Sequence, residues 1–164
     1  MFPQSLTRRA EDLLSRLRAK GLQISTAESC TGGLIAGLLT EIPGSSDVVD
    51  RGFVTYSNAA KMDMLDVPAG TLDSLGAVSR ETALAMVAGA LANSRASIAI
   101  AVTGVAGPGG GSFEKPVGLV HLAVQRSGRP VRHREARYGD IGRSAVRMAT
   151  IATALDMLLE ETEP

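Results

Sequence analysis

The sequence contains very few of the residues on which several classes of protein depend. Its 164 residues include one cysteine, two histidines and no tryptophan, and aromatic residues make up 3%. The single Cys30 excludes an intrachain disulfide and a cysteine-rich zinc site, and it fits a reducing compartment, so we expect a cytoplasmic protein. No cluster of histidine, cysteine, aspartate and glutamate has the spacing of metal ligands, so we expect no metal site.

Net charge and long apolar runs are also missing. Lysine and arginine (17) balance aspartate and glutamate (17), so no overall positive field attracts nucleic acid or an anionic membrane. The longest apolar runs are too short to span a bilayer, and the stretch from Arg8 to Lys20 interleaves charges with leucines, unlike a signal peptide. We therefore expect neither a nucleic-acid partner nor a membrane.

The composition is otherwise that of an ordinary globular protein. Hydrophobic residues make up 45% of the chain and charged residues 21%. The length is enough for one well-formed core but not for two, and the sequence shows no internal repeat or linker. We expect residues 1–164 to form one domain.

Hydrophobic periodicity predicts that helices and strands alternate along the chain. Spacings of three and four residues predict helices at Ser5–Lys20, Leu34–Ile42, from about Asn58, Ser79–Ala92 and from about Ile141. Short apolar runs predict strands at Leu22–Ala27, Gly52–Tyr56, Ser97–Val102, Val117–Gln125 and Val131–Tyr138, the last two as an antiparallel hairpin. The Asn58 side chain is a candidate helix cap. The order favours a three-layer α/β/α domain with a mixed sheet of about five strands.

The first polar cluster is Glu28–Gly33, which lies between a predicted strand and a predicted helix. Backbone N–H groups in such a turn point into a cleft and stabilise an anion, such as the oxyanion of acyl transfer. Ser29, Cys30 and Thr31 all qualify as a nucleophile at this position. The alternative interpretation is that they only cap the following helix.

Lys61 is unusual because it falls about three residues into a predicted helix, where the dipole disfavours a cation. The same field favours neutral lysine, which is the form that a general base needs. The alternative is an exposed lysine that bends into solvent. Tyr56, five residues earlier, could relay a proton or bind substrate, although a packing tyrosine is commoner.

The segment from Gly104 to Pro116 is too rich in glycine for a simple connection, and its glycines would let the backbone approach a ligand. Its spacing fits neither a P-loop nor a dinucleotide fingerprint, and a mobile surface loop is the alternative. Thr103 ends the preceding strand, where open α/β sheets present ligand contacts. Arg143 and Arg147, one helical turn apart, could face a phosphate or form surface ion pairs.

The two histidines, His121 and His133, lie in the predicted hairpin, away from the serine and glycine motifs. We interpret both as structural or exposed. A Ser-His-Asp arrangement is therefore disfavoured, and lysine is the leading base for a serine nucleophile.

Several motifs, taken in order, resemble the CinA carboxy-terminal family over nearly the whole chain. They are Thr26–Gly33, Gly52–Asn58 with Lys61, Gly76–Ser79, and Gly107–Gly111 with Glu114–Gly118. The resemblance implies hydrolysis of nicotinamide mononucleotide to nicotinic acid mononucleotide and ammonia, without a metal or organic cofactor. Larger relatives carry an additional amino-terminal domain resembling molybdopterin-binding proteins, whose activity we expect to be absent here.

Roles for individual residues follow from the resemblance. It implies Ser29 as nucleophile, Lys61 as its base and Tyr56 as a partner in proton transfer, with Thr103 and Arg143 in the substrate site. The remaining candidates for substrate binding come from the turn and the loop: Glu28, Thr31, Gly32, Gly33, Gly104 and Gly107.

Three alternatives stay open at this point. Cys30 could be the nucleophile, since a thiolate at a helix amino terminus is activated by the same field. The domain could bind pyridine nucleotides without catalysis. A competence- or damage-related accessory role is suggested only by the family's name, and the balanced charge gives it no physical support. The expected partner is the small-molecule substrate, and a homodimer is left open.

Overall fold

The computed structural model describes residues 1–164 and contains one mixed sheet in the order β2-β1-β3-β4-β5. The strands are β1 (Ile24–Glu28), β2 (Val49–Val54), β3 (Ile98–Gly104), β4 (Leu119–Arg126) and β5 (Arg132–Arg137). β1 pairs in parallel with β2 and β3, whereas β4 is antiparallel to both of its neighbours. The predicted mixed sheet of about five strands is confirmed.

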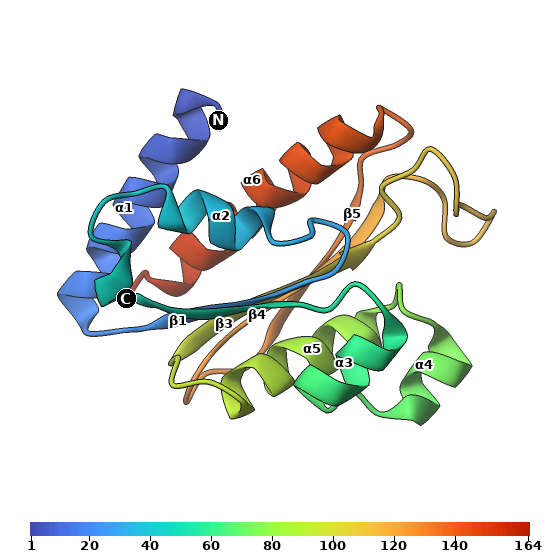
Figure 1. The fold of residues 1–164 in the computed structure, drawn as a ribbon, viewed down its shortest axis with the longest axis horizontal. Coiled ribbons are helices and arrows are strands. Elements are labelled where there is room, and N and C mark those ends of the chain that lie inside the picture. Colours follow the sequence, from blue (N-terminus) through green and yellow to red (C-terminus); the bar gives the residue numbers. More distant parts are fainter.

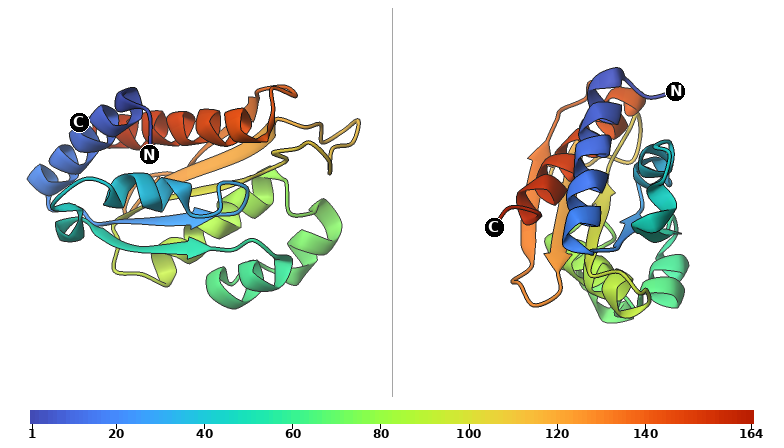
Figure 2. Two further views of the ribbon diagram at one scale, coloured as in Figure 1. Left: turned by 45° about the horizontal axis from the view of Figure 1, so that its top comes forward. Right: turned by 90° about the vertical axis from the view of Figure 1, so that its left-hand side faces the viewer.

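Helices cover both faces of this sheet (Figure 1). One face carries α1 (Gln4–Lys20), α2 (Leu34–Thr40) and α6 (Arg143–Glu161), and the other carries α3 (Asn58–Leu65), α4 (Ala69–Leu75) and α5 (Arg80–Ala92). A short 3-10 helix (Ser45–Asp47) precedes β2. The sheet lies between these two groups of helices in Figure 1, which confirms the three-layer architecture, and both chain ends lie on the side of α1 and α6 (Figure 2). None of these helices combines the length and the apolar character needed to cross a membrane.

The two faces of β3 build two different cores. Ile98, Ile100 and Val102 pack with the layer of α1, α2 and α6, whereas Ala99 and Ala101 pack with the layer of α5. Large aliphatic residues contribute roughly 1.5–3 kcal/mol each when fully buried, so the first core supplies more hydrophobic stabilisation. The small residues of the second core instead let the α5 layer approach the sheet closely.

The amino-terminal helix α1 follows directly from its sequence pattern. Its apolar residues recur at three- and four-residue spacing and are almost completely buried: Leu6, Ala10, Leu13, Leu14 and Leu17. The helix ends at Gly21, which adopts a left-handed conformation with φ of 63°. This helix was predicted at nearly the same residues.

Three local details differ from the sequence-based expectation. Ser57, not Asn58, caps α3, because its hydroxyl accepts a hydrogen bond from the Ala60 N–H at 3.0 Å. Helix α4 was not predicted, since only Leu72 of its seven residues is buried and no periodicity develops. Helix α6 begins at Arg143 rather than near Ile141, because Gly142 has a positive φ of 97° that a helix cannot include.

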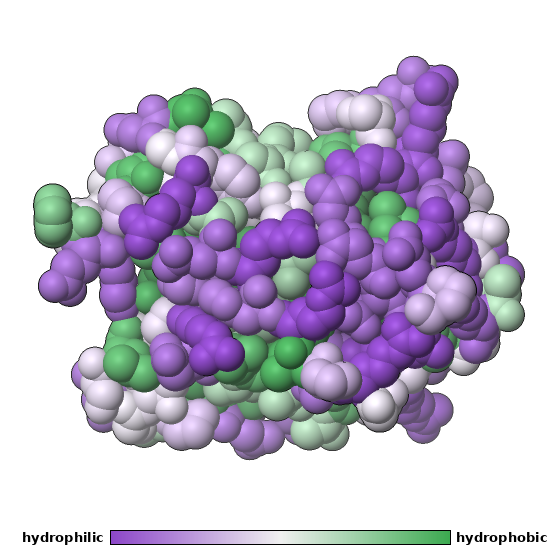
Figure 3. Space-filling view, turned by 180° about the vertical axis from the view of Figure 1, so that it is seen from behind, coloured by the Kyte–Doolittle hydropathy of each residue, from purple (hydrophilic) through white to green (hydrophobic).

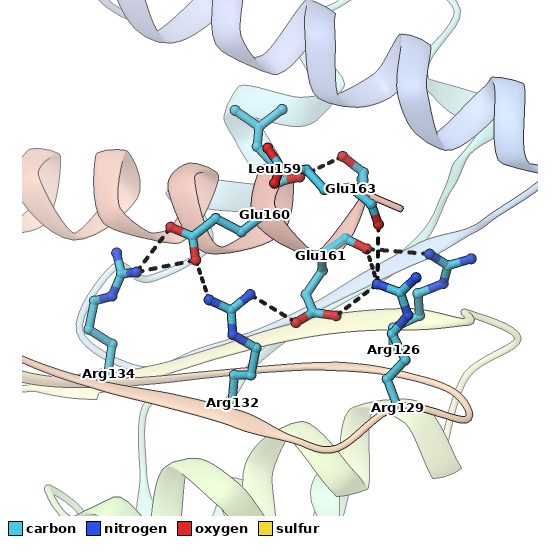
Figure 4. Close-up of polar contacts among 9 residues, drawn as sticks. Arg126, Arg129, Arg132, Arg134, Leu159, Glu160, Glu161 and Glu163 are labelled. Carbon is cyan, nitrogen blue, oxygen red and sulfur yellow. Dashed lines mark hydrogen bonds and ion pairs between the residues drawn. The ribbon is translucent and has the colours of Figure 1, made fainter.

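The far end of α6 is tied to the β4–β5 hairpin by charged side chains (Figure 4). Arg132 pairs with both Glu160 and Glu161, and Arg134 donates to Glu160 at 3.1 Å. Arg129 donates to the main-chain carbonyls of Glu161 and Glu163. The β5 side of the molecule is accordingly mostly hydrophilic (Figure 3). Charged side chains on this edge strand also protect it from pairing with another sheet.

Candidate active site

Three predicted site segments meet at one edge of the sheet because β1, β2 and β3 are parallel. The carboxyl ends of parallel strands lie at the same edge, where α/β proteins bind their ligands. Ser29 follows β1, Tyr56 lies two residues beyond β2, and Thr103 is the penultimate residue of β3. The topology therefore gathers residues that are up to 74 positions apart.

The turn that carries Ser29 is fixed by two backbone hydrogen bonds. The Ser29 N–H donates to the Val102 carbonyl of β3 at 3.0 Å, and the Gly32 N–H donates to the Ser29 carbonyl at 3.0 Å. Gly32 and Gly33 have φ values of 58° and 96°, a left-handed region that favours glycine. These two glycines let the chain leave β1 and enter α2 within five residues.

Glu28 was predicted to bind substrate, but its side chain is buried and only 1% exposed. Its carboxylate accepts hydrogen bonds from the N–H groups of Ile35 and Ala36, at 2.8 and 3.0 Å, and from the Thr31 hydroxyl at 2.7 Å. The carboxylate thus satisfies the free N–H groups at the start of α2, which have no cap from Gly33. Both side chains hold the turn in place, and the expected Glu28 contact with substrate is not supported.

Lys61 is among the largest fully buried side chains in the protein, with 1% exposure. Its Nζ atom lies 3.0 Å from Ser29 Oγ and 2.9 Å from the Thr55 carbonyl oxygen. No carboxylate pairs with it, and burial lowers the pKa of its ammonium group from the ordinary value. The alternative of a solvent-exposed lysine is wrong, and the environment favours the neutral amine of a general base.

Close packing of two helices brings Lys61 to this place. A Cβ atom added at Gly89 of α5 would lie 1.9 Å from the Leu65 carbonyl oxygen at the end of α3. Only glycine therefore allows α3 to lie so near α5. Nothing in the local sequence around Lys61 reveals this contact, because it depends on a glycine 28 positions away.

Cys30, the rival nucleophile, faces the hydrophobic core. It is 6% exposed and belongs to the cluster formed with α1, α2 and α6. Burial raises the pKa of its thiol to about 12, so the thiolate is scarce at neutral pH. The structure therefore argues against Cys30 as the nucleophile and leaves Ser29 beside the lysine.

Tyr56, Arg143 and Gly107 were predicted from separate segments, and the structure brings them into contact. The Arg143 guanidinium donates to the Tyr56 hydroxyl at 3.0 Å and to the Gly107 carbonyl at 2.8 Å. Tyr56 remains 63% exposed at this edge of the sheet. Arg143 therefore links the end of β2 to the glycine-rich loop beside the serine and lysine.

Thr103 and Gly104 pack against neighbouring backbone at this edge of the sheet and do not expose polar side-chain groups. Thr103 is 1% exposed, and its hydroxyl donates to the Ala77 carbonyl at 2.7 Å. A Cβ atom at Gly104 would lie 2.7 Å from the Leu119 carbonyl oxygen. Direct substrate contacts from these two residues stay a prediction.

The remaining part of the glycine-rich loop borders a cavity of about 760 Å³, together with Arg137, Gly139 and Asp140. None of Ser29, Tyr56 and Lys61 lines this cavity. His121 and His133 lie on β4 and β5 with ring nitrogens 2.9 Å apart, and they contact each other rather than the serine. No three side chains of histidine, cysteine, aspartate or glutamate are grouped as metal ligands.

Arg147 makes a contact that sequence reasoning did not find. Its Nε and Nη2 atoms donate to the carbonyls of Cys30 and Thr31, each at 3.1 Å. The only signal in the sequence was its position one helical turn after Arg143, which suggested a phosphate contact or a surface ion pair instead. Arg147 binds the serine turn itself.

Backbone N–H groups for an oxyanion are present in the same turn. The N–H groups of Cys30, Thr31 and Gly33 have no acceptor within the protein, whereas that of Gly32 is bonded to the Ser29 carbonyl. Gly32 is therefore not a free donor, although the sequence predicts that N–H groups of the turn Glu28–Gly33 stabilise an anion. The edge combines a serine, a buried amine and free N–H groups, which together suit acyl transfer.

Comparisons with known proteins agree with this chemistry. The CinA C-terminal domain family matches residues 6–162. The nicotinamide-nucleotide amidohydrolase PncC of Pseudomonas putida is 50% identical over 155 residues, which are 94% of this chain and 96% of that protein. The crystal structure of the competence/damage inducible protein CihA from Agrobacterium tumefaciens has 60% sequence identity and a TM-score of 0.98, and the match covers 99% of each chain.

Other relatives are much longer than this chain. The CinA-like protein of Geotalea uraniireducens is 50% identical over 144 residues, which are 88% of this chain but 34% of that protein. The chain thus spans about a third of the length of such curated relatives.

Proposed function

The chain belongs to the CinA C-terminal domain family, and from its site we propose that it hydrolyses the carboxamide of nicotinamide mononucleotide to give nicotinic acid mononucleotide and ammonia. The observation that carries the proposal is the 3.0 Å separation of Lys61 Nζ and Ser29 Oγ, with the lysine buried and without a carboxylate partner. The relative of matching length in Pseudomonas putida, named a nicotinamide-nucleotide amidohydrolase, supports the choice of substrate. We propose residues 1–164 as one amidohydrolase domain.

In the first step, neutral Lys61 accepts the hydroxyl proton of Ser29 while Oγ forms a bond to the carboxamide carbon. The carbonyl oxygen becomes an oxyanion, which free N–H groups of the turn stabilise. The carbon–nitrogen bond then breaks as Lys61 returns its proton to the departing nitrogen. Ammonia leaves, and an ester of Ser29 remains.

Water completes the cycle by the same chemistry in reverse. Lys61 takes a proton from water, and the resulting hydroxide adds to the ester carbon. The carbon–oxygen bond to Ser29 breaks, and Lys61 protonates Oγ. The products are nicotinic acid mononucleotide and the original enzyme, so no metal or organic cofactor is needed for the atoms to balance.

Tyr56 and Arg143 supply substrate contacts in this proposal. The tyrosine hydroxyl is bound to the Arg143 guanidinium and lies on an exposed side chain, so it can exchange that bond for one to substrate or relay a proton. Arg143 is exposed and carries a permanent positive charge that suits the phosphate of a mononucleotide. If Arg143→Ala left the Michaelis constant and turnover unchanged, this role would be refuted.

Ammonia release tests the proposal. Wild type, Ser29→Ala and Lys61→Met are compared on nicotinamide mononucleotide, with Cys30→Ala as the matched control for a neighbouring residue. We expect wild-type turnover in Cys30→Ala, and turnover lower by roughly 10³-fold or more in the other two. Binding measured by calorimetry without ammonia release from the folded wild type would instead support a non-catalytic nucleotide-binding module.

Three further points accompany the proposal. The single, buried Cys30 fits a reducing cytoplasm, which cell fractionation can test. Whether the protein forms a homodimer is left open, and light scattering can measure its oligomeric state. A DNA-related accessory role has no support in the balanced charge of the chain, and titration with DNA at low salt should give no binding.

A further inference from the structure

Arg147 is the one charged residue whose side chain hydrogen-bonds to the main chain of the turn from Ser29 to Gly33, called the serine turn. From α6 its guanidinium donates to two consecutive carbonyls, those of Cys30 and Thr31, and no carboxylate pairs with it. A Cβ atom added at Gly32 would lie 3.3 Å from its Nη2 atom, so the guanidinium rests directly against the turn. Fork-like binding of two acceptors is specific to arginine.

The contact with Arg147 fixes the direction in which the Thr31 N–H points, because the peptide unit is planar. The Cys30 carbonyl and the Thr31 N–H belong to one peptide unit, and in a trans peptide the two groups point in opposite directions. Because Arg147 holds the carbonyl, the Thr31 N–H must point away from Arg147. That N–H has no acceptor in the protein.

The layers of the fold show what lies on the side away from Arg147. Helix α6 covers one face of the sheet, and α3, which carries Lys61, covers the other (Figure 1). The Ser29 hydroxyl meets Lys61 Nζ at 3.0 Å, so it lies toward the α3 layer. Arg147 therefore lies on the side of the turn to which the Cys30 and Thr31 carbonyls point, and the Ser29 hydroxyl lies on the opposite side.

The charge of Arg147 adds to this effect. A guanidinium bound to a carbonyl polarises the peptide unit and makes its N–H a stronger donor, as in any hydrogen-bonded chain. Ion pairing with a carboxylate would weaken that polarisation, and Arg147 has none. Arg147 therefore differs from Arg132 and Arg134 of β5, which form ion pairs with glutamates at the carboxyl end of α6.

We propose that Arg147 is a positioning residue for the hydrolysis: by holding the Cys30 and Thr31 carbonyls it aims the Thr31 N–H at the oxyanion that forms when Ser29 attacks. The inference rests on the proposed serine mechanism. It assigns to Arg147 an effect on the transition state and not on binding of the substrate.

Steady-state kinetics of Arg147→Ala and Arg147→Lys give the first test. Loss of one oxyanion donor costs roughly 10²–10³ in kcat, so loss of its alignment should lower kcat by about 10-fold or more. KM should change little, because the oxyanion exists only in the transition state. Arg147→Lys keeps the charge without the fork and should fall between alanine and wild type.

The matched control is Arg129→Ala, since Arg129 also donates to two main-chain carbonyls, those of Glu161 and Glu163, far from the serine. It should keep kcat. Added methylguanidinium should partly restore kcat in Arg147→Ala and not change the control. If Arg147 only stabilised the fold, methylguanidinium would not restore kcat. Unchanged kcat in a folded Arg147→Ala or Arg147→Lys would overturn the proposal.

A second assay does not depend on the nucleotide. Phenylmethylsulfonyl fluoride sulfonylates an activated serine, and its sulfonyl oxygen occupies the oxyanion position. Mass spectrometry should show labelling of wild-type Ser29 and labelling at least several-fold slower in Arg147→Ala. Equal rates, or no labelling of wild-type Ser29, would overturn the inference. Labelling of wild type without ammonia release from nicotinamide mononucleotide would refute the proposed substrate alone.

Discussion

Where β1 and β2 end, one buried lysine has no carboxylate beside it, whereas near the carboxyl end of α6 arginines and glutamates are joined in pairs. Lys61 is 1% exposed, and its Nζ atom hydrogen-bonds only to a hydroxyl and a carbonyl oxygen. Glu161 is almost equally buried, at 4% exposure, but its carboxylate meets Arg132 at 3.1 Å. Lys61 and Glu161 are thus buried to nearly the same extent, but only Glu161 has a partner of opposite charge.

The difference separates a functional charge from a structural one. Removing a cation from water without a counterion favours its neutral form, which is the form that accepts a proton. An ion pair keeps both groups charged and links two elements, here α6 and the β4–β5 hairpin (Figure 4). Variants in the first region should therefore change turnover, and variants in the second should change stability.

The largest expected effect is that of Ser29→Ala. Loss of the nucleophile should lower turnover by on the order of 10⁴-fold or more. Stability should hardly change, because the hydroxyl's partner is the lysine alone. Ammonia release and urea unfolding measure the two quantities, and a turnover within 10-fold of Cys30→Ala would contradict the assignment.

Lys61→Met should lower turnover by about 10³-fold, the range of a general base. In wild type, turnover should rise with pH as Lys61 becomes neutral and level off below pH 10.5, because burial lowers the pKa of this amine. The pH profile of kcat measures this. A rise that continued beyond pH 10.5 would contradict a desolvated base.

Lys61→Met should lower turnover but raise the free energy of unfolding, because it removes a buried amine that is costly to desolvate when protonated. The folded-state pKa of Lys61 lies below the unfolded value, so the unfolded chain binds more protons and wild-type unfolding free energy rises as pH rises toward 10.5. Lys61→Met lacks this term, so its advantage over wild type should be largest below the folded-state pKa and decline as pH rises. Urea unfolding across this pH range tests the sign, and an advantage that grew with pH would contradict it.

Tyr56→Phe should have an intermediate effect. It removes the hydroxyl that accepts a hydrogen bond from Arg143 at 3.0 Å and leaves the exposed ring in place. A hydrogen bond to a charged group contributes about 1.5–3 kcal/mol, so kcat/KM should fall by roughly 10- to 100-fold. Unchanged kinetics would remove Tyr56 from the site.

Arg132→Ala should have the smallest effect on activity, with kcat and KM unchanged. It leaves the buried Glu161 carboxylate with only Arg129 at 4.0 Å. Because Arg132 is itself 44% exposed, we expect a loss of about 1–2 kcal/mol in unfolding free energy rather than the full cost of a broken buried pair. The control is Arg137→Ala, whose pair with Glu135 is exposed on both sides and should be worth less than about 1 kcal/mol.

Much of the fold could be predicted because its signals are local. The leucines of α1 recur at helical spacing, and β3 is a continuous apolar run, so both elements appeared at nearly their observed residues. The Ser29 turn was also visible, since Gly32 and Gly33 follow a strand and precede a helix. Helix α4 buries one leucine and left no such signal.

The site depended on contacts that no local pattern encodes. The approach of Lys61 to Ser29 requires the pairing of β1 with β2 and the packing of α3 on Gly89. Glu28 looked like a ligand because it is polar and adjacent to the serine, yet its carboxylate turns inward to the start of α2. Arg147 reaches the turn across 116 positions of sequence.

The most direct test of the serine–lysine assignment uses the aldehyde analogue of nicotinamide mononucleotide, labelled with ¹³C at the aldehyde carbon. A serine nucleophile adds to this carbon and forms a hemiacetal, whose tetrahedral ¹³C resonance is distinct from those of the free aldehyde and its hydrate. We predict this resonance with wild type and Cys30→Ala, and its absence with Ser29→Ala. Its absence with wild type, or its persistence with Ser29→Ala, would contradict the account.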